Sequence, residues 1–289
     1  MKYRIGWIGT GLMGAPMARH LASTHDVVVY NRTAEKARAL LPTVTVAENP
    51  EQIVAQCDII FTMLGMPEDV KSMYEDVLIP LAKPGTILID ATTSSPRLAR
   101  HLNHLGKTRN VFVFDAPVTG GVSGATNGTL TTMVGGDPDV FKMIRPLLEK
   151  FSKTLLYMGD SGQGQQTKLA NQIAIAGALA SLAEALAFAE ASQLPMEHVL
   201  TMIQSGAASS YASLMYGPKM LKSDYEATFF VRHYLKDLRL ALEETPIELP
   251  ILSSVYRVMD EIAKQFPYAG VQAIIAYYRD LISRKVDTK

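Results

Sequence analysis

The sequence predicts two regions of different class: a largely parallel, doubly wound α/β sheet in the first half and an all-α second half. Short apolar runs alternate with helical patterns as far as Tyr157, and this alternation is typical of a parallel sheet covered by helices. After Tyr157 the strand patterns stop and a long helical pattern begins. The Gly-rich joint "GDSGQGQ" separates the two, so we expect domains of residues 1–162 and 163–289.

The strands and helices of the first region follow from these runs. The expected strands are short and apolar, and most are rich in β-branched residues. They are Arg4–Ile8, Val27–Tyr30, Thr43–Val46, Ile59–Met63, Thr86–Ile89, Val111–Phe114, Leu130–Val134 and Thr154–Tyr157. Helices are expected in most of the gaps, among them Met13–Ala22, Ala34–Leu40, Pro96–Leu105 and Pro138–Glu149.

A long helical pattern opens the second region and runs to about Gln193. Small residues dominate it and Glu184 and Glu190 interrupt it, so we expect a helix buried between domains or subunits rather than a membrane span. Pro195 suits the first turn of the next helix. The further helical patterns are Pro195–Ile203, Val231–Glu244 and Ile251–Gln265.

Composition excludes several classes of function. Of the 289 residues 48% are hydrophobic and 19% charged, and 28 basic residues balance 28 acidic ones. A net charge of zero argues against binding to nucleic acid or to a membrane surface. The single cysteine, Cys57, and an N-terminus without the pattern of a signal peptide favour the cytoplasm. The six histidines are scattered without ligand spacing, so no metal site is expected.

The segment "IGWIGTGLMGAPMARHL" contains the pattern G-x-G-x-x-G at Gly9, Gly11 and Gly14. It follows an expected strand and opens an expected helix, which is the context of a dinucleotide-binding turn. Gly9 permits the tight turn, Gly11 lets the backbone approach a pyrophosphate, and Gly14 lets helix and strand pack closely. The helix N-terminus offers free N–H groups to the phosphates. The alternative is a tight turn without a ligand.

The end of the second expected strand bears on the choice of dinucleotide. Sites for NAD usually have an acidic residue there, whereas this chain has Asn31, Arg32 and Thr33. Arg32 can bind a 2′-phosphate through charge-assisted hydrogen bonds, and its two neighbours can add neutral ones. The sequence therefore predicts NADP(H) as cofactor. The alternative is that Thr33 only caps a helix and Arg32 is only a surface residue.

Lys168 is the only Lys or Arg between Lys153 and Lys219. On a nearly apolar helix its ammonium group must extend to water, pair with an acid or take part in chemistry.

Four segments, in this order, resemble the β-hydroxyacid dehydrogenases, the family of 3-hydroxyisobutyrate dehydrogenase and tartronate semialdehyde reductase. They are "IGWIGTGLMGAPMARHL", "DAPVTGGVSGATNGTLTTMVGG", "GQGQQTKLANQ" and "KDLRLAL". The resemblance extends to about Ile282. It implies a Rossmann-type N-terminal domain, an all-helical C-terminal domain, a long interdomain helix and a homodimer or homotetramer.

The resemblance also implies roles for individual residues. Lys168 matches the family's catalytic lysine and Asn171 its neighbouring asparagine. Thr119, Gly120 and Gly121 match the segment that binds the substrate carboxylate. The implied cofactor residues are Gly9, Thr10, Gly11, Leu12, Met13, Gly14, Asn31, Arg32, Thr33, Leu64, Thr93 and Lys236; Lys236 is also implied at the substrate.

This set suits hydride transfer between a nicotinamide and a small substrate that carries a carboxylate. Protonated Lys168 can stabilise the charge that develops on the carbonyl oxygen and donate the proton, and neutral Lys168 can act as base in oxidation. Asn171 can orient Lys168 or the substrate. Thr119 stands where many members have Ser and Gln172 where many have Asn, which leaves the particular substrate open.

We therefore expect an NADP-dependent reductase of short semialdehydes or glyoxylate. The alternatives are oxidation of 3-hydroxyisobutyrate or a related acid, an imine reductase, a class that typically lacks this lysine, and a non-catalytic cofactor-binding protein. For Lys168 the alternative is a surface lysine, and for Lys236 with Asp237 it is a solvated ion pair.

Overall fold

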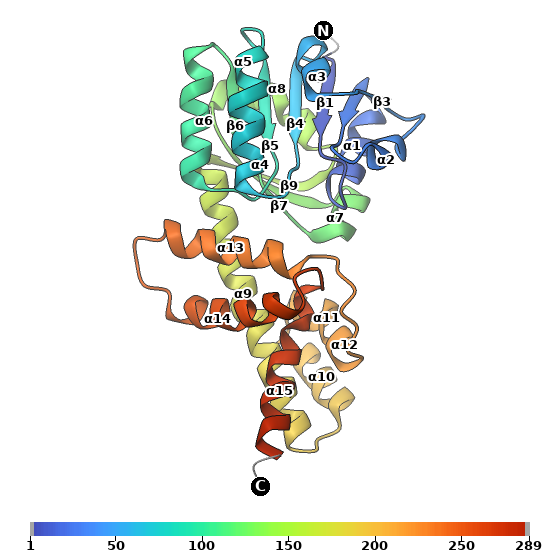
Figure 1. Ribbon diagram of the computed structural model, residues 1–289, viewed down its shortest axis with the longest axis vertical. Coiled ribbons are helices and arrows are strands. Elements are labelled where there is room, and N and C mark those ends of the chain that lie inside the picture. Colours follow the sequence, from blue (N-terminus) through green and yellow to red (C-terminus); the bar gives the residue numbers. More distant parts are fainter. Residues whose placement is uncertain (1–2, 287–289) are drawn as a thin grey trace. The chain divides into compact units, whose positions relative to one another are not determined.

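The computed structural model describes residues 3–286 (Figure 1). Its contacts divide the chain into two compact units, Met1–Lys168 and Leu169–Lys289. The sequence analysis places the division six residues earlier, at the beginning of helix α9 (Gln163–Ala191). The first turn of α9 belongs to the first unit because the main-chain N–H groups of Gly162 and Gln165 donate to the carboxylate of Asp115 on the sheet.

The first unit is built on a sheet of nine strands in the described part of the chain. The strand order is β3-β2-β1-β4-β5-β6-β8-β7, with β9 beside β8. Neighbours from β3 to β6 are parallel, as the βα alternation predicts. The strands are β1 (Ile5–Ile8), β2 (Val27–Tyr30), β3 (Thr45–Val46), β4 (Ile59–Thr62), β5 (Ile87–Asp90), β6 (Phe112–Asp115), β7 (Val118–Thr119), β8 (Leu130–Gly135) and β9 (Ser152–Gly159).

The sheet changes direction at β8, which is antiparallel to both β6 and β7. Asp115 pairs with Gly135 and Thr119 with Thr131, so β6 and β7 share one register and β7 continues β6. Pro117 separates them because it has no N–H to donate to the ladder. The sequence analysis did not predict β7, since two residues beside a proline carry no strand pattern.

Helices cover both faces of this sheet. Along β1, Ile5 and Trp7 pack in one cluster with helices α1 and α8, whereas Ile8 packs in another with α3 and α6. Trp7 stacks on Phe61 of β4, with ring centroids 5.3 Å apart. The helices are α1 (Gly14–Ala22), α2 (Ala34–Arg38), α3 (Pro50–Gln56), α4 (Pro67–Ser72), η1 (Met73–Leu78), α5 (Ile79–Leu81), α6 (Pro96–Thr108), α7 (Gly121–Asn127) and α8 (Pro138–Leu148).

The second unit is all-α, as predicted, with its own apolar core. It contains most of α9 and then α10 (Met196–Ser205), α11 (Tyr211–Met215), α12 (Gly217–Leu221), α13 (Val231–Glu244), α14 (Pro250–Gln265), η2 (Val271–Ala273) and α15 (Ile274–Val286). The sequence analysis did not predict α11, α12 and α15. By length and composition alone α9 could cross a membrane, and 44% of its most apolar window is buried inside the structure.

Candidate active site

The glycine turn lies at the carboxyl end of β1, where the strand order reverses between β1 and β4. Ligands of open α/β sheets bind at such a switch point. Gly9 has φ +100°, and a Cβ there would collide with the main-chain carbonyl of Met63. A Cβ on Gly14 would collide with the carbonyl oxygen of Gly9. At Gly11, by contrast, a Cβ would meet no described atom within 4 Å, so this face of the turn is open.

The beginning of α1 has the donors that a pyrophosphate needs. No described side chain caps this helix, and its first turn has no acidic residue. Its N–H groups and the positive end of its dipole therefore face no anion of the protein in that turn. The hydroxyl oxygen of Thr10 is buried and has no hydrogen-bond partner among the described residues. These features fit a bound dinucleotide, for which Gly11 would form the floor.

Asn31 connects the glycine turn to the end of β2. Its Oδ1 accepts from the main-chain N–H of Thr10 at 2.9 Å, and its Nδ2 donates to the carbonyl oxygen of Thr33 at 3.0 Å. Thr33 stands at the N-cap of α2, but its side chain makes no capping hydrogen bond there. The structure thus gives Asn31 a positioning role and does not support the alternative that Thr33 only caps the helix.

Arg32 has an acidic neighbour that the sequence analysis did not anticipate. Its Nη1 lies 3.6 Å from Oδ1 of Asp69, which belongs to the first turn of α4. The Arg32 side chain is 89% exposed and that of Asp69 37% exposed. An exposed pair of this kind contributes little stability, so Arg32 can turn toward another anion at small cost. No sequence pattern indicates Asp69, because 37 residues separate it from Arg32.

A hollow of about 560 Å³ adjoins the glycine turn. Gly11 and Leu12 line it from the turn, and Arg19 and Lys36 line it from α1 and α2. This region of the first unit therefore combines an open glycine backbone with two further cations.

The loops after β4 and β5 carry the predicted cofactor residues Leu64 and Thr93, and Thr92 joins them. The main-chain N–H of Leu64 donates to Oγ1 of Thr92 at 2.8 Å. The N–H of Thr92 in turn donates to Oδ1 of Asp90 at 3.0 Å, and the hydroxyl of Thr62 donates to the same oxygen at 2.9 Å. These bonds fix both loops at the carboxyl edge of the sheet.

Two buried acids end adjacent strands. Asp90 and Asp115 are register partners on β5 and β6. Burial raises the pKa of each from 3.8 to about 6, against the hydrogen bonds that both carboxylates accept. The sequence analysis missed both, although polar residues that follow apolar strands at the carboxyl edge of a parallel sheet are a signal for such a cluster.

The predicted carboxylate segment begins at the end of β7. Thr119 is the last residue of that strand, and Gly120 and Gly121 follow with φ of +127° and +64°. Residues with a side chain rarely adopt these backbone angles, so this turn requires its glycines. Gly121 is also the first residue of α7.

Lys168 lies on α9 and is 6% exposed, which does not fit the alternative of an exposed surface lysine. It belongs to the unit that carries the glycine turn, the loops of Leu64 and Thr93 and the turn after Thr119. Asn171, one helical turn further on, belongs to the second unit.

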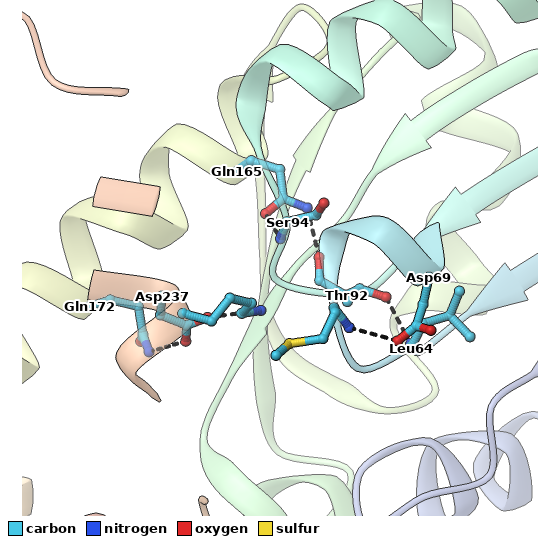
Figure 2. A network of polar contacts seen from close by, with 9 residues as sticks. Leu64, Asp69, Thr92, Ser94, Gln165, Gln172 and Asp237 are labelled. Carbon is cyan, nitrogen blue, oxygen red and sulfur yellow. Dashed lines mark hydrogen bonds and ion pairs between the residues drawn. The ribbon is translucent and has the colours of Figure 1, made fainter. Parts of the chain in front are cut away.

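A buried polar cluster in the second unit contains the remaining predicted residues. Nδ2 of Asn171 donates to Oε1 of Gln172 at 3.1 Å. Nε2 of Gln172 donates to Oδ2 of Asp237 at 2.7 Å (Figure 2). Nζ of Lys236 lies 3.0 Å from Oδ1 of Asp237, with side chains 5% and 3% exposed. The ion pair is therefore buried, and the alternative of a solvated pair is wrong. The sequence analysis did not anticipate that Gln172 binds Asp237.

The fold and the glycine turn are those of a dinucleotide-binding protein. No group of three or more metal-ligating side chains occurs in the described part of the chain. Residues 4–159 match the NAD-binding domain of 6-phosphogluconate dehydrogenase. Residues 162–278 match the NAD-binding domain of NADP-dependent 3-hydroxyisobutyrate dehydrogenase.

Individual proteins agree with these matches. The chain is 41% identical to the uncharacterized oxidoreductase YkwC of Bacillus subtilis, over 92% of this chain and 94% of that protein. It is 35% identical to 2-hydroxy-3-oxopropionate reductase of Escherichia coli, over 83% of each. The solved structure of Mycobacterium tuberculosis 3-hydroxyisobutyrate dehydrogenase with L-serine superimposes with a TM-score of 0.87 at 29% identity, over 96% of this chain and 100% of that one. The chain belongs to the β-hydroxyacid dehydrogenase family and is an NAD(P)-dependent oxidoreductase.

Proposed function

We propose that this protein transfers hydride between NADPH and a short aldehyde or hydroxy acid that carries a carboxylate, working chiefly as a reductase. The observation that carries the proposal is a buried lysine, Lys168, in the same unit as an open glycine turn. A buried amine in the unit that carries a cofactor-binding turn suits a proton-transfer residue better than a surface lysine.

The preference for NADPH rests on the end of β2. Arg32 forms an exposed ion pair, and Lys36 lies on the wall of the hollow beside Gly11. Both can approach a 2′-phosphate, and no acid occupies residues 31–33. Asp69 works against this preference, because its carboxylate lies near the same guanidinium.

The substrate class rests on the turn after β7 and on the relatives. Thr119 offers a hydroxyl, and the glycines after it leave the main-chain N–H groups without a Cβ in front of them. One relative is named as a reductase of 2-hydroxy-3-oxopropionate, and one solved relative is named with L-serine. Both small molecules pair a carboxylate with a nearby oxygen function, which agrees with an anion site beside a proton-transfer group.

The bound cofactor supplies the hydride. The turn after Thr119 holds the carboxylate of the substrate and thereby directs its carbonyl carbon. Protonated Lys168 stabilises the negative charge that develops on the carbonyl oxygen and then donates its proton to it. In the reverse direction neutral Lys168 takes the proton from the hydroxyl group.

Lys168→Ala tests this mechanism. We expect kcat to fall about 10²–10⁴-fold, the usual range for the loss of a general acid or base. NADPH affinity should remain near that of the wild type. Lys168→Arg should rescue poorly because a guanidinium cannot release a proton at working pH. A folded Lys168→Ala protein that binds NADPH and turns over within about threefold of the wild type would contradict the mechanism.

Cofactor preference is tested by kcat/KM with NADPH and with NADH. Arg32→Ala should reduce the preference for NADPH by about one to two decades and leave activity with NADH. Asp69→Asn should strengthen the preference because it removes the carboxylate from Arg32. Equal kcat/KM for both cofactors in the wild type would exclude the NADP assignment.

The carboxylate site is tested by comparing succinic semialdehyde with butanal, which lacks the carboxylate. Equal kcat/KM for these two aldehydes would exclude the carboxylate site.

A further inference from the structure

We propose that Gln165 is a positioning residue for this active site: it fixes the loop of Thr93 and the first turn of the lysine-bearing helix in one arrangement. The inference rests on the proposed role of Lys168.

The side chain of Gln165 holds both flanks of Thr93. Its Oε1 accepts from the main-chain N–H of Ser94 at 2.9 Å, and its Nε2 donates to the carbonyl oxygen of Thr92 at 2.7 Å. Figure 2 shows the amide between these two residues. Gln165 is 0% exposed, so water cannot replace either bond without opening the structure. This amide therefore holds the main chain on both sides of Thr93.

The main chain of Gln165 fixes the beginning of α9. Its N–H donates to Oδ2 of Asp115 at 2.8 Å, and the N–H of Gly162 donates to Oδ1 at 2.7 Å. A Cβ on Gly164 would lie 2.8 Å from both the main-chain and a side-chain oxygen of Asp115, so the helix approaches the strand as closely as a glycine allows. Lys168 follows Gln165 by three residues and lies on the same side of the helix.

These contacts join three segments of the proposed site. The carbonyl oxygen of Thr92 accepts from the Gln165 amide. The hydroxyl of the same Thr92 accepts from the main-chain N–H of Leu64. The loop after β4, the loop after β5 and the start of α9 are thus connected through two buried side chains, those of Thr92 and Gln165. A displacement of about 1 Å between reacting groups can cost about 10²-fold in rate. Gln165 therefore affects turnover although it need not touch the substrate.

The chemistry of this position requires an amide. One terminal atom of the side chain must accept from the N–H of Ser94, and the other must donate to the carbonyl oxygen of Thr92. The carboxamide of glutamine carries both an acceptor and a donor. An ionised glutamate has the same size but would direct an acceptor at the carbonyl of Thr92. A protonated glutamic acid restores one donor and one acceptor. Gln165→Glu should therefore recover function as the pH falls.

The experiment compares the wild type with Gln165→Ala, Gln165→Glu and, as matched control, Gln166→Ala on the exposed side of the same helical turn. We measure kcat, KM for NADPH and substrate, and the melting temperature. Gln165→Ala should lower kcat at least tenfold, because it releases the loop of Thr93 and the first turn of α9. Gln166→Ala should stay within twofold of the wild type.

The pH profile separates positioning from general destabilisation. The ratio of kcat for Gln165→Glu to kcat for the wild type should rise at least threefold as the pH falls from 8 to 6 at a temperature where both are fully folded. Asp90, Asp115 and Lys168 are present in both proteins, so this ratio isolates residue 165.

Two results would overturn the inference. One is a kcat for Gln165→Ala within threefold of the wild type. The other is a ratio of kcat for Gln165→Glu to kcat for the wild type that does not change with pH. This second measurement tests the inference even if Gln165→Ala does not fold. Lys168→Ala, measured alongside, distinguishes the two proposals. If it loses turnover and the Gln165 variants do not, only the positioning role fails; if it keeps turnover, the function proposed for Lys168 fails.

Discussion

Each of the two units buries a polar cluster that contains carboxylates. The two clusters differ in the groups that stabilise these carboxylates. In the sheet unit Asp90 and Asp115 accept hydrogen bonds from neutral donors, chiefly main-chain N–H groups, and burial raises the pKa of each to about 6. In the helical unit Asp237 lies beside the cation of Lys236 and the amide of Gln172. The sheet cluster thus fixes backbone, whereas the helical cluster holds side chains.

The largest effect should come from removing the acid of the helical cluster. Asp237→Ala leaves the ammonium group of Lys236 buried without its carboxylate, and we expect a loss of about 3–5 kcal/mol in the free energy of unfolding. Urea denaturation measures it. The double variant Asp237→Leu with Lys236→Met should recover most of the loss, because no charge then remains buried. A single variant as stable as the wild type would show that the pair contributes nothing to folding.

A smaller effect should appear as pH dependence in the sheet cluster. The pKa of Asp90 is raised from 3.8 to about 6 in the folded protein, so the folded state binds a proton that the unfolded state lacks between these values. Stability therefore increases as the pH falls from about 6 to about 4, by at most about 3 kcal/mol from this group. Asp90→Asn keeps an acceptor for Thr62 and Thr92 and should remove this contribution.

Unfolding measured at pH 7 and pH 4.5 checks the sign. The gain in stability at the lower pH should be smaller in Asp90→Asn than in the wild type, with Asp76→Asn as an exposed acidic control. An equal gain in stability in the wild type and in Asp90→Asn would contradict a raised pKa of Asp90.

The smallest effect should come from Gln172→Asn. The shorter side chain has the same groups but cannot span to Asp237 without moving the helices, so we expect a loss of about 1 kcal/mol, the value of one hydrogen bond. In combination with Asp237→Ala the cost of this substitution should disappear, since the bond is already gone. Additive losses would show that Gln172 acts through other contacts.

Much of the fold could be predicted from local pattern. The strands β1, β2 and β4, and the glycines at positions 9 and 14, follow from sequence because backbone geometry and burial impose residue type locally. The predicted strand Thr43–Val46 shortens to Thr45–Val46, and the helix Val231–Glu244 is confirmed as predicted. Strand β7, which is antiparallel to β8, could not be predicted because Pro117 interrupts the hydrogen-bond ladder that β6 and β7 form with β8.

The polar contacts of the site could not be predicted in the same way. Asp69 approaches Arg32 from the first turn of α4, and Gln165 binds Ser94 across 71 positions of the chain. Periodicity reports which face of an element is buried but not which partner a buried amide will find. Gln165 lies inside a segment that resembles the family, yet only the tertiary structure shows what its side chain holds.

The contacts of Gln165 also have a consequence for the order of folding. They join segments 71 and 73 residues apart, and closing so long a loop costs entropy before the contacts compensate it. If these contacts lie outside the folding nucleus, they form after the transition state. Gln165→Ala should then accelerate unfolding while refolding keeps nearly its normal rate. The contacts that hold the lysine-bearing turn on the sheet would then form late in folding and break early in unfolding.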